Sequence, residues 1–494
     1  MKQILNTLTL RHILGLGLIF RVLAAFFAKG YGFNDDQFEM LDLSQKWIEG
    51  LSFMEPGEKV YIFSLLYPGA HYLLFELCEK VGIYDPQTKA LLARLAHGLF
   101  SMLSIYYGYL LTLRLTNRSD TAKIVGLFMA IFWLFPFMSV RNLREFVCVP
   151  FLLMGSYYAA DSKPSLKSVL WSAWWFAWAF DMRLQSIFVP FGVGLSWLLV
   201  ASHRSKAIVF GLAFVGFVFV TQGLFDYLYY GDPLASTLAY ANYNATYYAG
   251  FPNGPWYQYF GTVAGLLLGL SAIPLIGGYV RTAQYTFPTK VVFWSSLLFF
   301  AFHSYFPNKQ ERFILPFMPY ILLLGVIGFQ DFYEKNEWKP WVRKATKVLL
   351  VWLLVLNTVA LFVLTFTYSK RARVEAMRYL REKGDVTNLI MDGDGPAPPP
   401  PLFYLQKFVD YYELNSEKNA ENLKKEMAAG TKPQPNYVIM AGDDNADERL
   451  KQLKTLFPTL RHKVDIEPGL VDNIAFKLNP KHNQNEVWRI YKIK

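Results

Sequence analysis

The chain of 494 residues contains very little cysteine and little charge for its length. Its two cysteines, Cys78 and Cys148, exclude a disulfide scaffold. Charged residues make up 18% of the chain and hydrophobic residues 53%. A soluble protein of this length would divide into domains with charged surfaces, so this composition excludes that class. Long apolar runs fill most of residues 12–368 instead, which is the pattern of membrane spans.

Other absences narrow the function further. The sequence has no histidine-rich or spaced carboxylate cluster, so we predict no metal site and no cofactor. The net charge of +11 does not indicate nucleic acid, because Lys and Arg are concentrated in short loops between apolar runs. Lys29-Gly30-Tyr31 follows the first apolar run in place of a small-residue cleavage site. We therefore expect a retained span rather than a removed signal peptide.

The apolar runs predict an all-α polytopic membrane protein. A helix needs about 20 residues to cross a bilayer, and we count about eleven candidate runs on this basis. They are 12–28, 91–115, 122–139, 146–160, 167–180, 186–200, 206–225, 260–280, 290–306, 313–330 and 346–368. The runs 146–160 and 167–180 are short, and a re-entrant hairpin is the alternative for this pair. Either choice leaves the topology of the remaining chain unchanged.

Basic residues are divided unevenly between alternate loops. One set of loops carries Arg114, Arg118 and Lys123; Lys163 and Lys167; Arg204 and Lys206; Arg281 and Lys290; and Lys335, Lys339, Arg343, Lys344 and Lys347. The opposite set includes the loop 226–259, which has 34 residues and neither Lys nor Arg. Cytoplasmic loops are enriched in Lys and Arg, so we place the N-terminus inside and the loop 226–259 outside.

The last quarter of the chain differs in kind from the rest. Residues 370–494 are polar and alternate short strand-like and helix-like patterns, so we predict a small extracytoplasmic α/β domain. Expected strands lie near 388–391 and 437–440, and expected helices at 371–383, 416–428 and 446–456. Residues 1–369 then form the transmembrane domain, with a first outer loop at 29–90 and a second large one at 226–259.

Four charged clusters interrupt the apolar surroundings, all on the predicted outer side. They are Asp35, Asp36 and Glu39; Arg141, Arg144 and Glu145; Asp181 and Arg183; and Lys309, Glu311 and Arg312. Charges at membrane depth are costly unless they are paired or face a cavity. Guanidinium groups suit a phosphate, and a carboxylate suits proton abstraction from a hydroxyl. Together they indicate transfer of a group from a lipid-borne phosphate donor to an alcohol.

Structural interpretations compete with this chemistry. An acidic pair in a loop is more often a solvated or helix-capping pair than a catalytic one. The Arg141–Glu145 and Asp181–Arg183 clusters could equally be ion pairs at helix ends. The Lys309–Arg312 cluster could be interfacial charges whose stems lie along apolar surface.

Several of these segments resemble motifs of glycosyltransferase family 22, the multi-span mannosyltransferases. The stretch Asn308-Lys309-Gln310-Glu311-Arg312-Phe313-Ile314-Leu315-Pro316 resembles the family's HKExRF(L/I)xP motif. The loop that begins Asp226-Tyr227 and continues to Gly254-Pro255-Trp256-Tyr257 resembles its D-S-x-x-Y-G and H-P-W-x-W-Y segments. Asn34-Asp35-Asp36-Gln37-Phe38 resembles P-D-E-x-F-Q, and Arg183-Leu184-Gln185 resembles the R-P-Q/T element. The ordered set covers roughly residues 10–330.

The resemblance implies a C-type glycosyltransferase fold and a polyprenyl- or dolichyl-phosphate-linked mannose donor, with inverting direct displacement. Asp35 would be the general base, assisted by Asp36. Lys309, Arg312, Arg183 and Arg141 would bind the donor phosphate, and Glu311, Asp226, Trp256 and Tyr257 would contact the acceptor or sugar. The sequence departs from the motifs at Asn308 and Gly254, where the family has histidine, and at Gln310, where it has glutamate.

We therefore predict a membrane glycosyltransferase that moves a hexose, with mannose favoured, to a lipid-linked or glycan acceptor at the outer face. A polytopic lipid or sugar transporter, or a flippase, is the alternative. Transporters place ionisable groups near mid-span and often contain two repeats, whereas these charges lie at span ends and no repeat is found. The C-terminal domain favours a bacterial cytoplasmic membrane, with the endoplasmic reticulum as the alternative.

Overall fold

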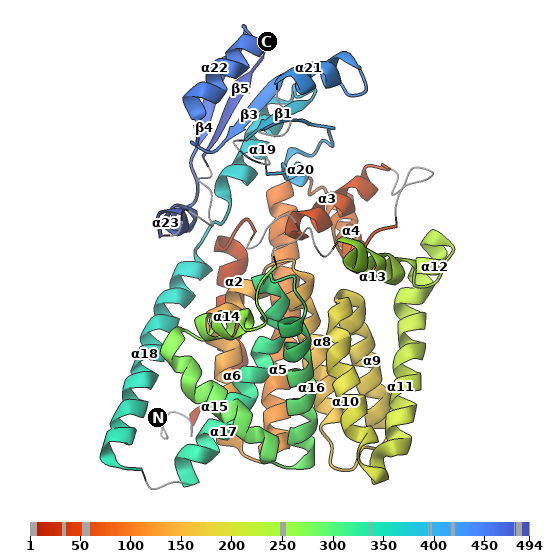
Figure 1. Ribbon diagram of the computed structural model, residues 1–494, viewed down its shortest axis with the longest axis vertical. Helices are drawn as coiled ribbons and strands as arrows, with labels where there is room; N and C mark the ends of the chain where they lie inside the picture. Colours follow the sequence, from red (N-terminus) through yellow and green to blue (C-terminus); the bar gives the residue numbers. More distant parts are fainter. Residues whose placement is uncertain are drawn as a thin grey trace. The chain divides into compact units, whose positions relative to one another are not determined.

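The computed structural model describes residues 7–31, 36–51, 60–247, 253–335, 338–393, 395, 398–415, 420–478, 480 and 487–493. The chain divides into two compact units (Figure 1). The first contains Met1–Ala25, Met54–Ala70 and Ala93–Thr365, and the second contains Phe26–Phe53, His71–Leu92 and Phe366–Lys494. The predicted boundary between 369 and 370 lies close to the last of these divisions, but segments 26–53 and 71–92 are grouped with the C-terminal residues. We retain that boundary as a proposal.

The first unit is helical. Its longer helices are α2 (Leu10–Phe27), α5 (Pro86–Thr116), α6 (Ser119–Ile131), α8 (Arg144–Ala159), α9 (Leu166–Met182), α10 (Phe188–Leu198), α11 (Arg204–Val218), α13 (Ala235–Tyr247), α14 (Gln258–Leu266), α15 (Ala272–Arg281), α16 (Phe287–Tyr305), α17 (Met318–Lys335) and α18 (Pro340–Thr365). Shorter ones are α7 (Leu134–Ser139), α12 (Leu224–Tyr230), η1 (Leu184–Ile187), η2 (Ala201–His203), η3 (Phe219–Gly223), η5 (Gly269–Ser271), η6 (Thr282–Gln284) and η7 (Glu311–Phe317). Many of the longer helices run side by side (Figure 1).

Four helical segments in the described part of the chain are long and apolar enough to cross a membrane. They are Leu10–Phe27, Ala201–Tyr230, Glu311–Lys335 and Pro340–Thr365. Gln258–Leu266 and Gly269–Gln284 form a further candidate that is bent by 102°. These segments agree with a multi-pass membrane protein. The count of about eleven spans remains a prediction.

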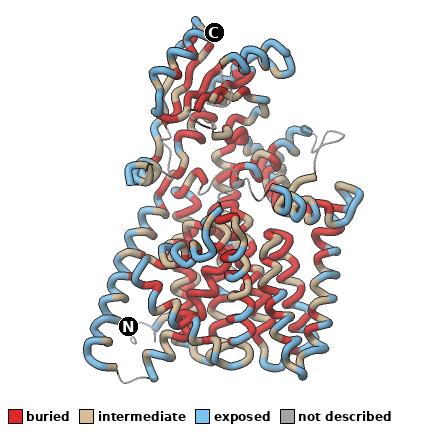
Figure 2. The backbone as a smooth tube through the Cα atoms, in the orientation of Figure 1, coloured by how far each residue is buried: buried red, intermediate tan, exposed pale blue. Residues whose placement is uncertain are grey.

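Burial separates a central helix from peripheral ones. The apolar stretch of Glu311–Lys335 is 89% buried, whereas that of Pro340–Thr365 is 22% buried and that of Leu10–Phe27 is 28% buried. Figure 2 shows the same contrast, with exposed residues along α18 and buried ones in the middle of the bundle. Apolar side chains that remain exposed on a membrane-spanning helix face lipid, so we assign α2 and α18 to the lipid-facing rim.

One buried arginine joins three of these helices. Arg21 on α2 donates to the Ser101 hydroxyl at 2.6 Å and to the carbonyls of Met129 and Ala130 at 3.1 and 3.2 Å. It is 1% exposed. Because its donors end on oxygens of α5 and α6, this buried charge serves helix packing and is not a candidate for substrate binding.

Glycines allow helices α15 and α17 to approach each other closely. A Cβ atom on Gly278 of α15 would lie 2.1 Å from the carbonyl oxygen of Gly325, and one on Gly328 would lie 2.0 Å from that of Gly278. The backbones of α15 and α17 therefore touch at these positions. Small residues at helix contacts are a common packing device in membranes, where lipid removes the usual hydrophobic drive.

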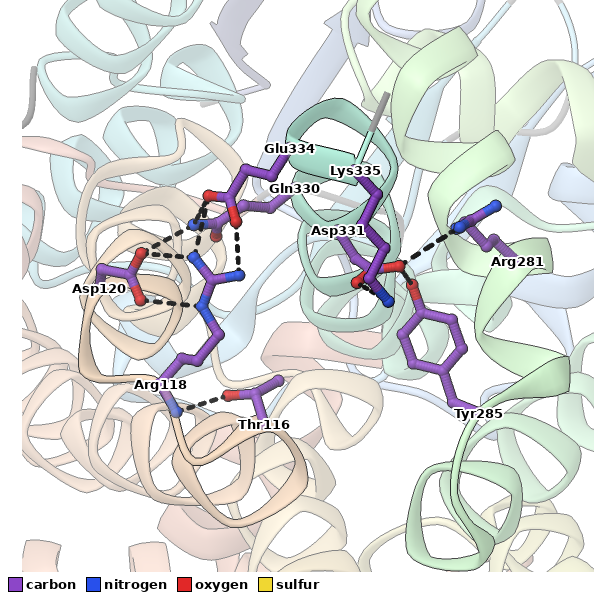
Figure 3. Close-up of polar contacts among 9 residues, drawn as sticks. All are labelled: Thr116, Arg118, Asp120, Arg281, Tyr285, Gln330, Asp331, Glu334 and Lys335. Carbon is purple, nitrogen blue, oxygen red and sulfur yellow. Dashed lines mark hydrogen bonds and ion pairs between the residues drawn. The ribbon is translucent and has the colours of Figure 1, made fainter. Parts of the chain in front are cut away.

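Polar side chains fix both flanks of the C-terminal end of α17 (Figure 3). On one side Arg118 pairs with Asp120 and Glu334, each at 2.7 Å. On the other side the Tyr285 hydroxyl donates to Asp331 at 2.6 Å. These contacts hold the N-terminal end of α6, the end of α15 and the start of α16 against α17.

The second unit contains a five-stranded mixed sheet of order β2-β1-β3-β5-β4. Its strands are β1 (Leu389–Asp392), β2 (Tyr412–Leu414), β3 (Tyr437–Ala441), β4 (Arg461–Ile466) and β5 (Trp488–Lys492). Strands β2, β1 and β3 are parallel, and β5 is antiparallel to β3 and β4. Its helices are α3 (Asp36–Ile48), α4 (Leu66–Lys80), α19 (Arg371–Lys383), α20 (Leu402–Leu405), α21 (Ala420–Ala428), α22 (Ala446–Leu456) and α23 (Leu470–Leu478).

The sheet confirms the predicted α/β character of the C-terminal residues. Ile390, Val438 and Tyr491 lie in the core beneath Leu423 of α21 and Leu453 of α22. The predicted strands and the helices at 371–383 and 446–456 are present, and the predicted helix 416–428 begins at Ala420 within the described residues. This part of the prediction succeeded because alternating buried runs and amphipathic helices are local patterns.

Candidate functional site

A buried carboxylate between two arginines lies at the centre of the site. Glu145 accepts ion pairs from Arg183 Nη1 at 2.7 Å and from Arg312 Nε at 3.3 Å. The side chains of Glu145, Arg183 and Arg312 are 2%, 6% and 12% exposed. Together the two arginines and the glutamate carry a net charge of +1. This balance favours binding of an anion at the site.

Three segments far apart in sequence supply these side chains. Glu145 lies in the first turn of α8, where the helix dipole favours a carboxylate. Arg183 follows α9 in extended conformation (φ −148°, ψ 108°), directly before η1. Arg312 lies in the first turn of η7, where the chain resumes a helix after α16. The structure thereby brings together three of the four charged clusters found in the sequence.

A hollow adjoins this group. Its polar lining comes from Arg144, Asp181, Arg183, Gln185, Gln222, Ser236 and Tyr240, and its apolar lining includes Phe63 and Phe180. The guanidinium of Arg144 lies over the Phe63 ring at 5.0 Å. Positive groups, a carboxylate and amides in one hollow match a ligand that carries a phosphate and hydroxyl groups.

Among the residues that the structure describes, several buried polar atoms of this lining have no hydrogen-bond partner. They are both carboxylate oxygens of Asp181, Oε1 of Gln185, Oε1 of Gln222 and Nη2 of Arg183. The Thr221 hydroxyl lies beside Asp181 but donates to the Phe217 carbonyl at 2.8 Å. Native proteins satisfy most buried polar groups, so a concentration of unsatisfied ones in one hollow indicates a ligand-binding position.

Two of the motif-like segments contact each other in the first unit. The amide of Gly254 donates to the Pro307 carbonyl at 3.0 Å, and the Tyr259 hydroxyl donates to the Gln310 carbonyl at 3.0 Å. A Cβ atom on Gly254 would lie 2.7 Å from Cγ of Lys309. Gly254 therefore suits this close approach, which a histidine at that position would alter.

Lys309 does not have the surroundings expected for a phosphate ligand. Its ammonium donates to the carbonyls of His303 and Ser304 at 2.6 and 2.7 Å, and also to that of Phe306. An ammonium has three N–H donors, and here all of them cap the C-terminal end of α16. Burial also lowers the pKa of Lys309. This geometry argues against the predicted phosphate role and favours a structural one.

Asp226 is likewise engaged within the protein. It accepts from the Ser236 amide at 2.9 Å, from the Ser236 hydroxyl at 2.8 Å and from the Gln222 amide at 2.9 Å. It is fully buried and caps the first turn of α13. The predicted sugar contact of Asp226 stays a prediction, and in this structure both of its oxygens accept hydrogen bonds within the protein.

The remaining candidates differ in accessibility. Arg141 is fully buried, and its guanidinium lies over the Phe137 ring at 4.6 Å. Glu311 is exposed, and Trp256 and Tyr257 are 66% and 59% exposed. Their predicted sugar contacts remain predictions. Asp35 lies outside the described residues, and for Asp36 only its place at the start of α3 is described.

Sequence reasoning missed Gln222 and Tyr240. Gln222 stands in the apolar run 206–225, and an amide inside a predicted span is itself a signal of function. The structure adds that Gln222 lies in a π-helical turn, η3, between α11 and α12. Such turns occur often at functional sites because they re-aim side chains within a helix. Tyr240 left no comparable signal among the aromatic residues of its loop.

The comparison with protein families decides the assignment. The model of the Alg9-like mannosyltransferase family matches residues 13–389. The chain belongs to this family. It is a membrane glycosyltransferase, and the predicted resemblance and enzyme class are confirmed.

Individual relatives agree with the family assignment. The mannosyltransferase APTG1 of Arabidopsis thaliana is 23% identical over 410 residues, which cover 77% of this chain and 73% of the relative. GPI mannosyltransferase 3 of Yarrowia lipolytica is 21% identical over 379 residues, which cover 75% of this chain and 70% of the relative.

Solved structures show the fold. ArnT from Cupriavidus metallidurans, solved with undecaprenyl phosphate bound, matches with a TM-score of 0.62 and 11% identity, over 98% of this chain and 97% of that one. The oligosaccharyltransferase AglB from Archaeoglobus fulgidus, solved with an inhibitory peptide and a dolichol phosphate, matches with a TM-score of 0.52 and 11% identity, over 93% and 73%. The predicted C-type glycosyltransferase fold is therefore shared.

Proposed function

We propose that this chain transfers a mannosyl residue from a polyprenyl- or dolichyl-phosphate-linked donor to a hydroxyl of a glycan or glycolipid acceptor at the outer face of the membrane. The observation that carries the proposal is the cationic group of Arg183 and Arg312 on Glu145, beside a hollow with unsatisfied polar atoms. Its setting in a mannosyltransferase family favours the enzyme over the transporter.

The arginines supply the charge that the leaving phosphate needs. Arg183 has an unsatisfied Nη2, and Arg144 lines the same hollow, so both are proposed as donor-phosphate ligands together with Arg312. Guanidinium groups bind phosphate with paired N–H donors and stabilise the negative charge that grows as the sugar departs. Lys309 is left in its structural position.

The reaction is proposed as a single inverting displacement. The acceptor hydroxyl oxygen attacks the anomeric carbon while the bond from that carbon to the phosphate oxygen breaks. The hydroxyl proton passes to a carboxylate, and the electron pair of the broken bond leaves on the lipid phosphate. Asp35, with Asp36 assisting, is proposed as the base because its segment resembles the first-loop motif of the family.

We base the proposed membrane on how much of the chain each relative aligns with. ArnT, a bacterial protein, aligns with 98% of the chain, which includes the C-terminal sheet, whereas the family model ends at residue 389. We therefore propose a bacterial cytoplasmic membrane. The endoplasmic reticulum remains the alternative, and the sequence relatives from Arabidopsis and Yarrowia support it.

The proposal is tested with purified protein, polyprenyl-phosphate mannose and a glycolipid acceptor. Loss of a general base lowers turnover by roughly 100- to 10,000-fold, so Asp35→Asn should lose activity on this order. Arg183→Gln should lower kcat/KM for the donor by roughly 100-fold. Asp447→Asn and Arg343→Gln, at exposed positions, are the matched controls and should retain activity.

The outcomes separate the parts of the proposal. Full activity in Asp35→Asn removes the assigned base but not the phosphate site. Unchanged donor kinetics in Arg183→Gln removes the phosphate site. A wild-type protein that does not transfer mannose, but does exchange labelled lipid between leaflets, would support the transporter alternative.

A further inference from the structure

Within the described part of the chain, helix α23 presents an apolar face that is exposed. Leu470, Ile474 and Leu478 are 77%, 45% and 80% exposed. They are spaced by four residues, so they lie along one face of the nine-residue helix. Single exposed apolar residues are ordinary, but a row of them at helical spacing marks a contact surface.

The opposite face of α23 is fixed to the chain that follows helix α18. Asp472 accepts from the backbone amide of Lys370 at 2.7 Å. A Cβ atom on Gly469 would lie 2.2 Å from the carbonyl oxygen of Tyr368, so the backbones touch there. At 100° per residue, Asp472 lies about 160° around the helix from the middle of the apolar row. The apolar row therefore points away from residues 368–370.

The attachment point follows directly after two candidate membrane spans. Tyr368 is three residues past the end of α18 at Thr365, and Lys29 is two residues past the end of α2 at Phe27. The amide of Ser369 donates to the Lys29 carbonyl at 3.2 Å. Both α2 and α18 are long and apolar enough to cross the membrane. Residues 29 and 368–370 thus lie near the level at which both spans leave the hydrocarbon.

Aromatic side chains also indicate that the membrane boundary lies near residues 29 and 368–370. Phe27 and Phe366 contact each other with ring centroids 5.1 Å apart, and each is 48% exposed. They stand at the ends of the two spans, where aromatic residues gather at the boundary between lipid tails and headgroups. A helix fixed within a few residues of them is within reach of the same boundary.

We propose that α23 lies in the membrane interface, with Leu470, Ile474 and Leu478 inserted among the lipid chains of the outer leaflet. A nine-residue helix is about 13.5 Å long, too short to span a bilayer but sufficient to lie along its surface. Lys477 is exposed beside the apolar row and can reach lipid phosphates. The helix ties the C-terminal sheet to the bilayer, and this role is independent of the proposed transfer reaction.

Spin labelling of the full chain in vesicles tests the proposal. Single cysteines at 474 and 478, in a background with Cys78→Ala and Cys148→Ala, carry a nitroxide. Oxygen concentrates in lipid and a charged nickel chelate stays in water. Both labels should therefore collide more with oxygen than with nickel. A label at Asn473, about 100° from the middle of the row, is the matched control and should show the reverse.

Three results would overturn the proposal. The labels at 474 and 478 could match the control at 473, which places the row in water. They could be shielded from both reagents and broaden each other, which places the row against a second copy. If the cysteine variants do not fold, the unmodified protein is treated with a photoactivatable phospholipid, with α22 as the control helix. Labelling of residues 470–478 that does not exceed labelling of α22 would overturn the proposal.

Discussion

Glu145 is the residue on which the arrangement of the site depends. It is the shared counter-ion of Arg183 and Arg312, and all three side chains are largely buried. Pairing with one carboxylate allows the two guanidinium groups to lie close together. Its carboxylate also sets their positions, so we regard Glu145 as a positioning residue rather than a substrate contact.

Removal of the Glu145 charge should destabilise the protein strongly. Glu145→Gln removes the carboxylate that pairs with both buried guanidinium groups, and breaking a buried pair in this way costs about 3–5 kcal/mol. The measurement is thermal unfolding in detergent. Glu334→Gln is the control because its pair with Arg118 is partly exposed, and such pairs contribute about 0–1 kcal/mol. Equal shifts in the two variants would contradict a buried ion group at Glu145.

The buried carboxyl of Asp42 should make the free energy of unfolding of the second unit depend on pH. Burial raises the pKa of its carboxyl from 3.8 to about 7, although the Phe403 amide donates to it at 2.7 Å. A carboxyl whose folded pKa lies above its unfolded value holds its proton more tightly in the folded state. Its contribution to stability is therefore greatest at acid pH and is lost as the pH rises from 3.8 to about 7.

Replacement by asparagine removes this titration and keeps an acceptor for the Phe403 amide. Asp42→Asn should raise the free energy of unfolding at pH 8 by on the order of 1 kcal/mol, a value reduced to allow for screening by solvent, and should have less effect at pH 4. Unfolding temperatures of the variant and wild type between these pH values provide the measurement. A gain that stays constant across the range would mean that Asp42 is ionised throughout.

Among the helices, the contact of α15 with α17 has the least tolerance for added atoms. Gly278→Ala would place a methyl group 2.1 Å from the Gly325 carbonyl oxygen. Overpacking of this kind costs about 1–3 kcal/mol. Gly277 precedes it on the same helix and has no neighbour within 4 Å of a Cβ position. Gly277→Ala should therefore leave the unfolding temperature unchanged or slightly raised. Similar losses in both variants would contradict a close backbone contact that is specific to Gly278.

The sequence predicted those elements whose pattern is local. The helix at 446–456 and the strand near 437–440 could be found because amphipathic and buried runs repeat along the chain itself. The bend of 102° between α14 and α15, and the π turn at Phe219–Gly223, could not be found this way. They depend on contacts with other helices rather than on residues near in sequence. Helix α23 (Leu470–Leu478) was also not predicted from the sequence.

The site shows the same division. Arg183 and Arg312 could be predicted to act together because buried charges of a membrane protein need partners or a cavity. Their shared counter-ion was not predicted, since it requires knowledge of which helix ends meet. Lys309 and Asp226 carried motif-like signals, yet the structure uses them to cap α16 and α13. A motif identifies a segment, whereas the contacts decide which of its residues remain available to a substrate.

For the chain as a whole, the proposed function depends on where the donor phosphate binds. A cryo-electron microscopy structure of the protein with polyprenyl phosphate tests this most directly. We expect phosphate density within hydrogen-bond distance of the Arg183 guanidinium, in the hollow that Arg144 and Gln185 line. Phosphate density elsewhere, beyond hydrogen-bond distance of the Arg183 guanidinium, would contradict this prediction.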